Sequence, residues 1–226
     1  MRLRLPRLAA GLALLALATA GCGAAASSSA DPSPSVTTLP PETMPPFDPA
    51  AWHGAVLGTP LELPELELTD QNGAPFQLRS TLGDPTLLFF GYTHCPDICP
   101  LHMATIARAM EKVGLTTDDL DVVMVTNDPA RDTPEAMGDF LGRFNEGFVG
   151  LTGDLDTIVA AMATLHLPPP EFSEPQEDGA YWVGHAAQVI AFDAEGVAKI
   201  VYPFGVELEA WTADLPKLVA GEQPHP

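Results

Sequence analysis

The sequence predicts an α/β domain in which a central mixed β-sheet is flanked by helices. Two short and mostly apolar runs, Thr86–Gly91 and Asp121–Thr126, have the length and composition of buried strands. Each is followed by a segment with the apolar spacing of a helix, Pro100–Val113 in the first case and Thr133 to about Phe144 in the second. This alternation is typical of parallel strands joined by helical crossovers.

The segments on either side of this unit are expected to supply the edges of the sheet. Upstream, leucines alternate with glutamates between Leu61 and Leu68, and an Asp-Gln-Asn-Gly turn signal precedes a return through Phe76 and Leu78. This pattern predicts an N-terminal β-hairpin extension. Downstream, we expect a short strand at Phe148–Leu151, a helix at Asp154–Leu165 and a loop at Pro168–Ala180. A strand pair is expected at Gln188–Phe192 and Lys199–Tyr202, and a closing helix at Glu207–Val219.

The chain is strongly acidic. Its 226 residues include 10 Lys and Arg against 30 Asp and Glu, which gives a formal net charge of −20 at pH 7. Such a surface repels the phosphates of nucleic acids, so no nucleic-acid partner is expected, whereas cations and basic proteins are compatible with it. Three cysteines are too few for a disulfide framework, so each of them needs its own explanation.

Residues 1–21 have the pattern of an export signal peptide. Three arginines precede an apolar stretch that is shorter than the ~20 residues of a membrane span, and small residues follow it. The sequence Leu-Ala-Thr-Ala-Gly-Cys at 17–22 resembles a bacterial lipobox, in which the cysteine becomes lipidated; the alternative is ordinary signal cleavage with Cys22 incidental. We therefore predict an exported protein that a lipid on Cys22 anchors to the outer face of the cytoplasmic membrane.

Composition divides the remainder of the chain into three parts. Residues 22–50 are rich in Ala, Ser, Thr and Pro and carry almost no charge, so they are predicted to form a disordered tether behind the lipid anchor. The folded domain is predicted at 51–221, a size that supports a hydrophobic core without disulfides. Residues 222–226 are predicted to be a disordered tail.

The chemistry is expected at Cys95 and Cys99, which lie between the first buried strand and its helix. If Cys99 lies in the first helical turn, both sulfurs face the same side, because residues i and i+4 are neighbours on a helix. A helix N-terminus also favours thiolate over thiol. Two such thiolates suit either a soft metal ion or dithiol redox chemistry. The Cys-x-x-x-Cys spacing is one residue longer than the usual redox motif, which shifts the balance modestly towards a metal.

A metal site would take its third ligand from a histidine, and the candidates are His94, His102, His166 and His185. His166 ends a predicted helix, where the helix dipole favours a structural role for a cation. His185 lies between an acidic loop and a buried strand, near the edge of the sheet where ligands bind in open α/β folds. Spacing alone leaves the choice open, with His185 the best placed. Two soft thiolates with an imidazole suit copper.

Four segments, taken in order, resemble the motifs of the SCO/SenC copper-delivery family. They are Phe90–Pro100, which contains both cysteines, Asp128–Pro134, Gly150–Gly153 and Tyr181–His185. Together they span nearly the whole predicted domain. The resemblance implies a thioredoxin-like fold that binds one copper ion, as Cu(I), Cu(II) or both, with Cys95, Cys99 and His185 as the ligands.

The resemblance also implies a function and partners. The protein would be a copper metallochaperone rather than an enzyme. It would assist assembly of the copper centre of a respiratory haem-copper oxidase, with the copper-acceptor subunit as its partner and other extracytoplasmic copper carriers as further candidates. The alternative is a thiol–disulfide oxidoreductase that reduces the acceptor's cysteines, with Cys95 attacking and Cys99 resolving. A peroxide-reducing or redox-sensing protein is a third hypothesis.

One position departs from the family pattern. The family commonly has Asp immediately before the ligand histidine, whereas this chain has Gly184. The orientation of the imidazole or the redox tuning of the site is therefore expected to differ. Asp97 is a candidate for a nearby negative charge, although an acid in the first turn of a helix ordinarily serves the helix dipole. Asp128 and Arg131 are expected to form a salt-bridged turn beside the site, with partner docking as the alternative.

Overall fold

The computed structural model describes residues 47–224. The predicted signal peptide, the lipidation site Cys22 and nearly all of the predicted tether therefore lie outside the described residues. Within residues 47–224, no helix has both the length and the apolar character needed to cross a membrane.

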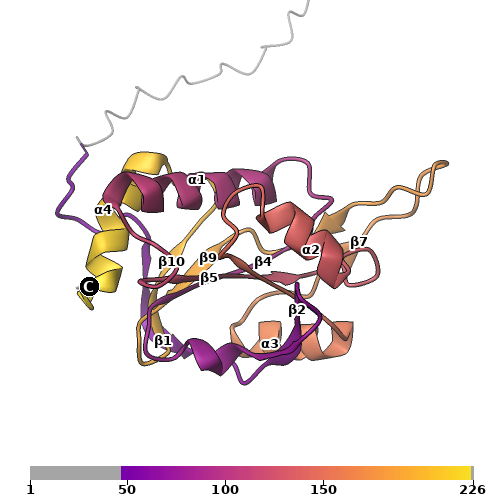
Figure 1. Ribbon diagram of the computed structural model, residues 1–226, viewed down its shortest axis with the longest axis horizontal. Coiled ribbons are helices and arrows are strands. Elements are labelled where there is room, and N and C mark those ends of the chain that lie inside the picture. Colours follow the sequence, from indigo (N-terminus) through magenta and orange to yellow (C-terminus); the bar gives the residue numbers. More distant parts are fainter. Residues whose placement is uncertain (1–46, 225–226) are drawn as a thin grey trace, which may run out of the picture. The chain divides into compact units, whose positions relative to one another are not determined.

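An eight-stranded mixed sheet forms the centre of the domain (Figure 1). Its strand order is β1-β10-β9-β4-β5-β6-β2-β3. The three central strands β4, β5 and β6 run parallel, and the other neighbours pair antiparallel. The bounds are β1 Ala55–Glu62, β2 Glu67–Asp70, β3 Pro75–Gln77, β4 Thr86–Gly91, β5 Asp121–Thr126, β6 Val149–Thr152, β9 Val189–Phe192 and β10 Val197–Tyr202.

Helices cover both faces of this sheet (Figure 1). They are α1 Ile98–Val113, α2 Pro134–Leu141, α3 Leu155–Thr164 and α4 Leu208–Val219, with a short 3-10 helix η1 at Leu78–Thr81. The helices α1, α2 and α4 pack on one face and α3 on the other. The prediction of a mixed sheet flanked by helices is therefore confirmed.

The strand β4 shows why the sequence folds in this way. Successive side chains of a strand point to opposite faces of the sheet. Leu87 and Phe89 accordingly pack in the core under α1 and α4, whereas Leu88 and Phe90 pack in the core over α3. Full burial of such a side chain contributes about 1.5–3 kcal/mol, so a continuous apolar run is stable here only because both faces are covered.

Capping residues fix the helices close to the predicted positions. Thr133 caps α2, because its side chain accepts a hydrogen bond from the backbone amide of Ala136, and a proline occupies the first helical position. Asp154 caps α3 by accepting from the amide of Thr157. Gly114 ends α1 in the left-handed conformation at φ 76°, where residues other than glycine are disfavoured.

The edges of the sheet differ in part from the expectation. The predicted hairpin is present, since β2 pairs with β3 in the register Leu68↔Phe76. The preceding strand β1, however, pairs with β10 at the opposite edge. Most of its side chains are exposed, so no apolar alternation reveals it in the sequence. The expected loop at 168–180 also contains a short strand β7, Glu171–Phe172, which pairs with β8, Val183–Gly184, in a separate two-stranded sheet.

Candidate metal centre

The fold brings two distant parts of the chain together at the carboxyl end of β4. Cys95 follows β4 and lies just before α1, and Cys99 lies in the first turn of that helix. His185 comes directly after β8 and before β9, which pairs with β4. Ligands in open α/β sheets bind at this end of the strands, so the location agrees with the expectation for this fold class.

The donor atoms of Cys95, Cys99 and His185 all lie within 4.8 Å of one another, close enough to hold one metal ion. The Sγ of Cys99 is 3.7 Å from Nε2 of His185. Both cysteines are free and buried, with exposed fractions of 9% for Cys95 and 0% for Cys99. Among the residues that the structure describes, no other group of three or more His, Cys, Asp or Glu side chains meets the same geometric condition.

The imidazole of His185 is oriented for coordination by its own backbone environment. Its Nδ1 lies 2.9 Å from the carbonyl oxygen of Ala186, and because a carbonyl only accepts, Nδ1 carries the proton. Nε2 then keeps its lone pair, which faces the sulfurs. The rings of Phe89 and Tyr92 meet the imidazole edge to face, with centroids at 5.9 and 5.6 Å. A peptide carbonyl thus orients the histidine beside Gly184.

The two thiols have opposite acidities. The pKa of Cys95 is lowered to about 3, first by a hydrogen bond from the Cys99 thiol and further by His185 and by the backbone amides of Cys99 and Asp97, which outweigh burial. The amide of Cys99 donates to the Cys95 sulfur at 3.5 Å. The pKa of Cys99 is raised, first by burial and then by the neighbouring Cys95 thiolate. The metal-free pair therefore holds one thiolate and one thiol at neutral pH.

The other candidate histidines lie apart from this set. His94 is half exposed, with its Nδ1 3.1 Å from the hydroxyl of Thr93 and 3.6 Å from Asp132. His102 is buried, and its Nε2 donates to the carbonyl of Ala187 at 2.8 Å. His166 is exposed at the end of α3 with a positive φ of 56°.

The expected salt-bridged turn beside the site is confirmed. Arg131 pairs with the fully buried Asp128, and its guanidinium stacks over the ring of Tyr181 at 3.6 Å. The hydroxyl of Tyr181 donates to Asp128 at 2.8 Å. This contact links the Asp128 turn to the segment that carries His185. Asp97 is exposed at the N-cap of α1, where its side chain makes no capping hydrogen bond.

Three residues of the site could not be assigned from the sequence. Phe89 and Tyr92 surround His185, but an aromatic residue at the end of a buried strand carries no signal for such a role. Asp132 is fully buried and accepts hydrogen bonds from the backbone and hydroxyl of Thr93, at 2.9 and 2.6 Å, so it fixes the chain just before Cys95. Asp132 belongs to a recognised motif, but its hydrogen-bond partner Thr93 lies 39 positions earlier and comes close only in the folded protein.

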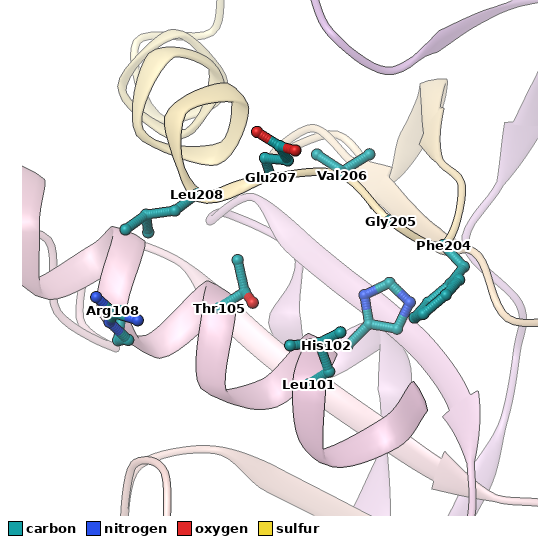
Figure 2. A pocket seen from close by; sticks show the side chains of 9 residues that line it. All are labelled: Leu101, His102, Thr105, Arg108, Phe204, Gly205, Val206, Glu207 and Leu208. Carbon is teal, nitrogen blue, oxygen red and sulfur yellow. The ribbon is translucent and has the colours of Figure 1, made fainter. Parts of the chain in front are cut away.

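A pocket of about 210 Å³ adjoins the same helix (Figure 2). It lies between α1 and the segment that joins β10 to α4. Its wall includes Leu101 and His102 on one side and Phe204 on the other, as Figure 2 shows. The ring of His102 meets that of Phe204 edge to face at 5.7 Å. His102 therefore lines this pocket and also contacts Phe89, whose ring meets the imidazole of His185.

The fold and the site together define a thioredoxin-like protein with a Cys-x-x-x-Cys and histidine centre. The family model described as SCO1/SenC matches residues 58–220. The chain therefore belongs to the SCO1/SenC family.

Relatives and solved structures agree with this assignment. A protein of Stutzerimonas stutzeri named for copper binding is 33% identical over 162 residues, 71% of this chain and 78% of its own. The structure of Bradyrhizobium japonicum ScoI with copper bound is 32% identical with a TM-score of 0.63, over 70% of this chain and 99% of that one. Apo Sco1 from Thermus thermophilus is 29% identical with a TM-score of 0.64, over 75% and 96% of the two chains.

The matched region is a smaller share of some other relatives. It covers 64% of an SCO2-like protein of Rickettsia felis and 47% of the mitochondrial protein SCO2 of Saccharomyces cerevisiae. One structure with a TM-score of 0.56 and 20% identity, described as showing a disulfide switch in BsSco, a member of the Sco family of cytochrome c oxidase assembly proteins, shares the fold.

Proposed function

We propose that this chain is a copper metallochaperone that binds one copper ion through Cys95, Cys99 and His185 and delivers it to an acceptor protein. The observation that carries the proposal is the convergence of two sulfurs and one imidazole nitrogen within 4.8 Å. Soft thiolates with an imidazole match the ligand preference of copper. The copper-bound relative from Bradyrhizobium japonicum supports the choice of metal.

The residues of the chain explain how the ion is loaded. Cys95 is already a thiolate, so it offers the first ligand without losing a proton. Cys99 must release its proton as the ion binds, because only the thiolate is a metal ligand. His185 supplies Nε2, held by the hydrogen bond from Nδ1 to Ala186.

Three ligands leave the ion accessible to a ligand of another protein. An acceptor thiolate or imidazole can then add to the ion before Cys95, Cys99 or His185 leaves it, so the cargo passes by stepwise exchange and is never released to solvent. We propose that the acceptor is the copper-acceptor subunit of a respiratory haem-copper oxidase. The description of BsSco as a member of a cytochrome c oxidase assembly family supports this choice. Other extracytoplasmic copper carriers are proposed as donors or further partners.

The proposed setting is the outer face of the cytoplasmic membrane. In this proposal, residues 1–21 are a signal peptide, a lipid on Cys22 is the anchor and residues 22–50 are a tether for the domain at 51–221, with a disordered tail at 222–226. A neighbouring structure described as a SCO1/SenC family lipoprotein of Bacillus anthracis supports the lipid anchor.

A second function, reduction of a disulfide in the acceptor, is favoured by the acidity of Cys95. Its thiolate would attack the disulfide, form a mixed disulfide and release one acceptor thiolate. Cys99 would then lose its proton and attack the Cys95 sulfur, which forms the Cys95–Cys99 disulfide and releases the second acceptor thiol. Two electrons pass to the acceptor. His185 is dispensable for these steps, which separates the two functions experimentally.

The test is anaerobic copper titration of the reduced protein in a Cys22→Ser background, which leaves only the two site cysteines. We expect one copper per chain, and we expect Cys95→Ser, Cys99→Ser and His185→Ala each to weaken binding. His166→Ala is the matched control, because His166 is exposed and outside the site. Unchanged affinity in all three site variants would contradict the chaperone. Full reduction of an acceptor disulfide by His185→Ala, with loss in either cysteine variant, would favour the reductase.

A further inference from the structure

His102 is the one candidate histidine whose hydrogen bond reaches the loop that carries His185. It lies on α1, three residues after Cys99, where residues i and i+3 share a helix face. Its side chain is buried, with 4% of the residue exposed. Its Nε2 lies 2.8 Å from the carbonyl oxygen of Ala187, two residues beyond His185. A carbonyl oxygen only accepts, so Nε2 of His102 carries the proton and donates.

The loop that receives this hydrogen bond has no regular secondary structure. Residues 185–188 connect β8 to β9. The carbonyl of Ala186 accepts from Nδ1 of His185 itself, and the next carbonyl, that of Ala187, accepts from His102. The first bond sets the direction of the imidazole relative to its own loop. The second bond sets the position of that loop relative to the helix that carries Cys99.

The ring of His102 is itself held in place by aromatic neighbours. Phe89 contacts it at a centroid distance of 5.2 Å, and Phe89 also contacts the imidazole of His185 at 5.9 Å. Phe204 also meets the ring edge to face, as Figure 2 shows. These two aromatic contacts restrict the ring while its donor nitrogen is directed at Ala187. The hydrogen bond therefore joins the cysteine helix to the histidine loop through a packed side chain.

We propose that His102 is a positioning residue of the metal centre, which holds His185 against the Cys99 sulfur by its hydrogen bond to the carbonyl of Ala187. The proposal rests on the copper site proposed above. His102 is not a ligand, because among residues 47–224 the donor atoms that converge are those of Cys95, Cys99 and His185 alone. It acts through His185, as the partners that orient metal-ligating histidines do, and loss of such partners typically weakens metal affinity 10–100-fold.

The test compares His102→Leu, which keeps bulk but removes the donor, with His102→Gln, which keeps an N–H donor. We expect His102→Leu to weaken copper binding about 10–100-fold. We also expect it to reduce the nitrogen hyperfine signal of His185 in the EPR spectrum of the Cu(II) protein. We expect His102→Gln to recover most of both. Wild-type affinity and an unchanged nitrogen signal in His102→Leu would overturn the proposal.

A double-mutant cycle separates positioning from general stability. In a His185→Ala background, His102→Leu should cause no further loss of copper affinity, because the ligand that it positions is absent. An equal loss with and without His185 would overturn the proposal. If His185→Ala alone leaves copper binding unchanged, the proposed ligand set fails instead.

A metal-free readout keeps the positioning role testable on its own. In ¹⁵N NMR spectra of the reduced protein without copper, the His185 ring should show one tautomer, protonated on Nδ1. His102→Leu should mix or broaden that signal. An unchanged His185 signal in His102→Leu would contradict the positioning role.

Discussion

Two polar clusters of the domain, one around Asp214 and one at the metal centre, each include a histidine, and they differ in how completely their polar atoms are paired. In the first, the fully buried carboxylate of Asp214 accepts hydrogen bonds from the backbone and the ring of His53, at 2.8 and 2.9 Å. It also accepts from Tyr202 at 3.1 Å and pairs with Lys217 at 3.3 Å. All of these donors bind the Asp214 carboxylate. The cluster therefore connects the start of the domain, β10 and α4 through hydrogen bonds that have no free position for a ligand.

The metal centre has the opposite character. The two sulfurs of Cys95 and Cys99 and the Nε2 of His185 direct their lone pairs at a shared space, and their donors outside that space hold the ligands in place. Cys95 and Cys99 share a single proton at neutral pH. A cluster in which every polar atom has a fixed partner stabilises the fold, whereas three potential ligands that share only one exchangeable proton form a site that a metal ion can occupy.

The largest expected effect is on stability, at Asp214. Replacing one partner of a buried charged cluster leaves the others unpaired, and we expect Asp214→Ala to lower the free energy of unfolding by about 3 kcal/mol. We expect no change in copper affinity, because the cluster shares no residue with the metal centre. Chemical denaturation and copper titration measure the two quantities. Weakened copper binding in folded Asp214→Ala would show that the Asp214 cluster and the metal centre are not independent.

The second effect is on the acidity of Cys95. Because the pKa of Cys95 is lowered on folding, its thiolate persists as the pH falls. The thiolate stabilises the folded state fully above pH ~8.5, the ordinary pKa of a thiol, and this stabilisation is lost as the pH falls towards 3. The alkylation rate of Cys95 should therefore change little between pH 5 and 7. In the same range, the rate of an ordinary thiol falls about tenfold for each unit by which the pH is lowered. Cys99→Ala removes the largest cause of the lowered pKa and should restore that dependence.

Rapid iodoacetamide kinetics in a Cys22→Ser background check this prediction, because Cys99 is fully buried. A steep pH dependence in the parent protein would contradict the proposed thiolate. In contrast, Asp214→Ala should leave the alkylation profile as it is.

The third effect is a count of protons. The metal-free pair holds one proton at neutral pH, since the pKa of Cys95 is lowered and that of Cys99 is raised. Copper binding to two thiolates should then release about one proton between pH 7 and 8, and affinity should rise about tenfold per pH unit. Calorimetry in buffers of different ionisation enthalpy measures the release. Release of two protons would show that both cysteines are ordinary thiols.

The smallest effect is expected at Gly184. A Cβ there would lie 3.7 Å from the Cβ and carbonyl oxygen of Glu171, so the backbone has room for a side chain. Because Nδ1 of His185 is already bound to the Ala186 carbonyl, Gly184→Asp should change copper affinity less than the 10–100-fold typical of a lost orienting partner. Gly184→Asn is the uncharged control. A larger change in the aspartate variant alone would show that the carboxylate displaces the carbonyl.

Strong local signals in the sequence predicted the parts of the fold that surround the site. The runs of β4 and β5 agree with the structure at both ends, because burial on two faces demands a continuous apolar pattern. The exposed strand β1 has no such pattern, and its pairing with β10 is a long-range contact that spacing does not encode.

For the site, as for the fold, the sequence predicted local features and missed long-range contacts. Cys95 and Cys99 are only four residues apart, so their closeness was predictable, although Cys95 lies in the turn before α1 and only Cys99 is on the helix. His185 comes close to the cysteines only because of the order of the strands in the sheet. Local chemistry did not decide which histidine is the third ligand, and the resemblance of four motifs to the family indicated His185. The hydrogen bond of His102 joins residues 85 positions apart, and nothing in the local sequence of either one indicates it.

X-ray absorption at the copper edge of the Cu(I)-loaded protein tests the central claim most directly, because it reports the atoms bound to the ion. We expect two sulfur ligands and one imidazole nitrogen in the parent protein, with the nitrogen lost in His185→Ala and both sulfurs kept. A copper environment without sulfur, or one that His185→Ala leaves unchanged, would contradict it.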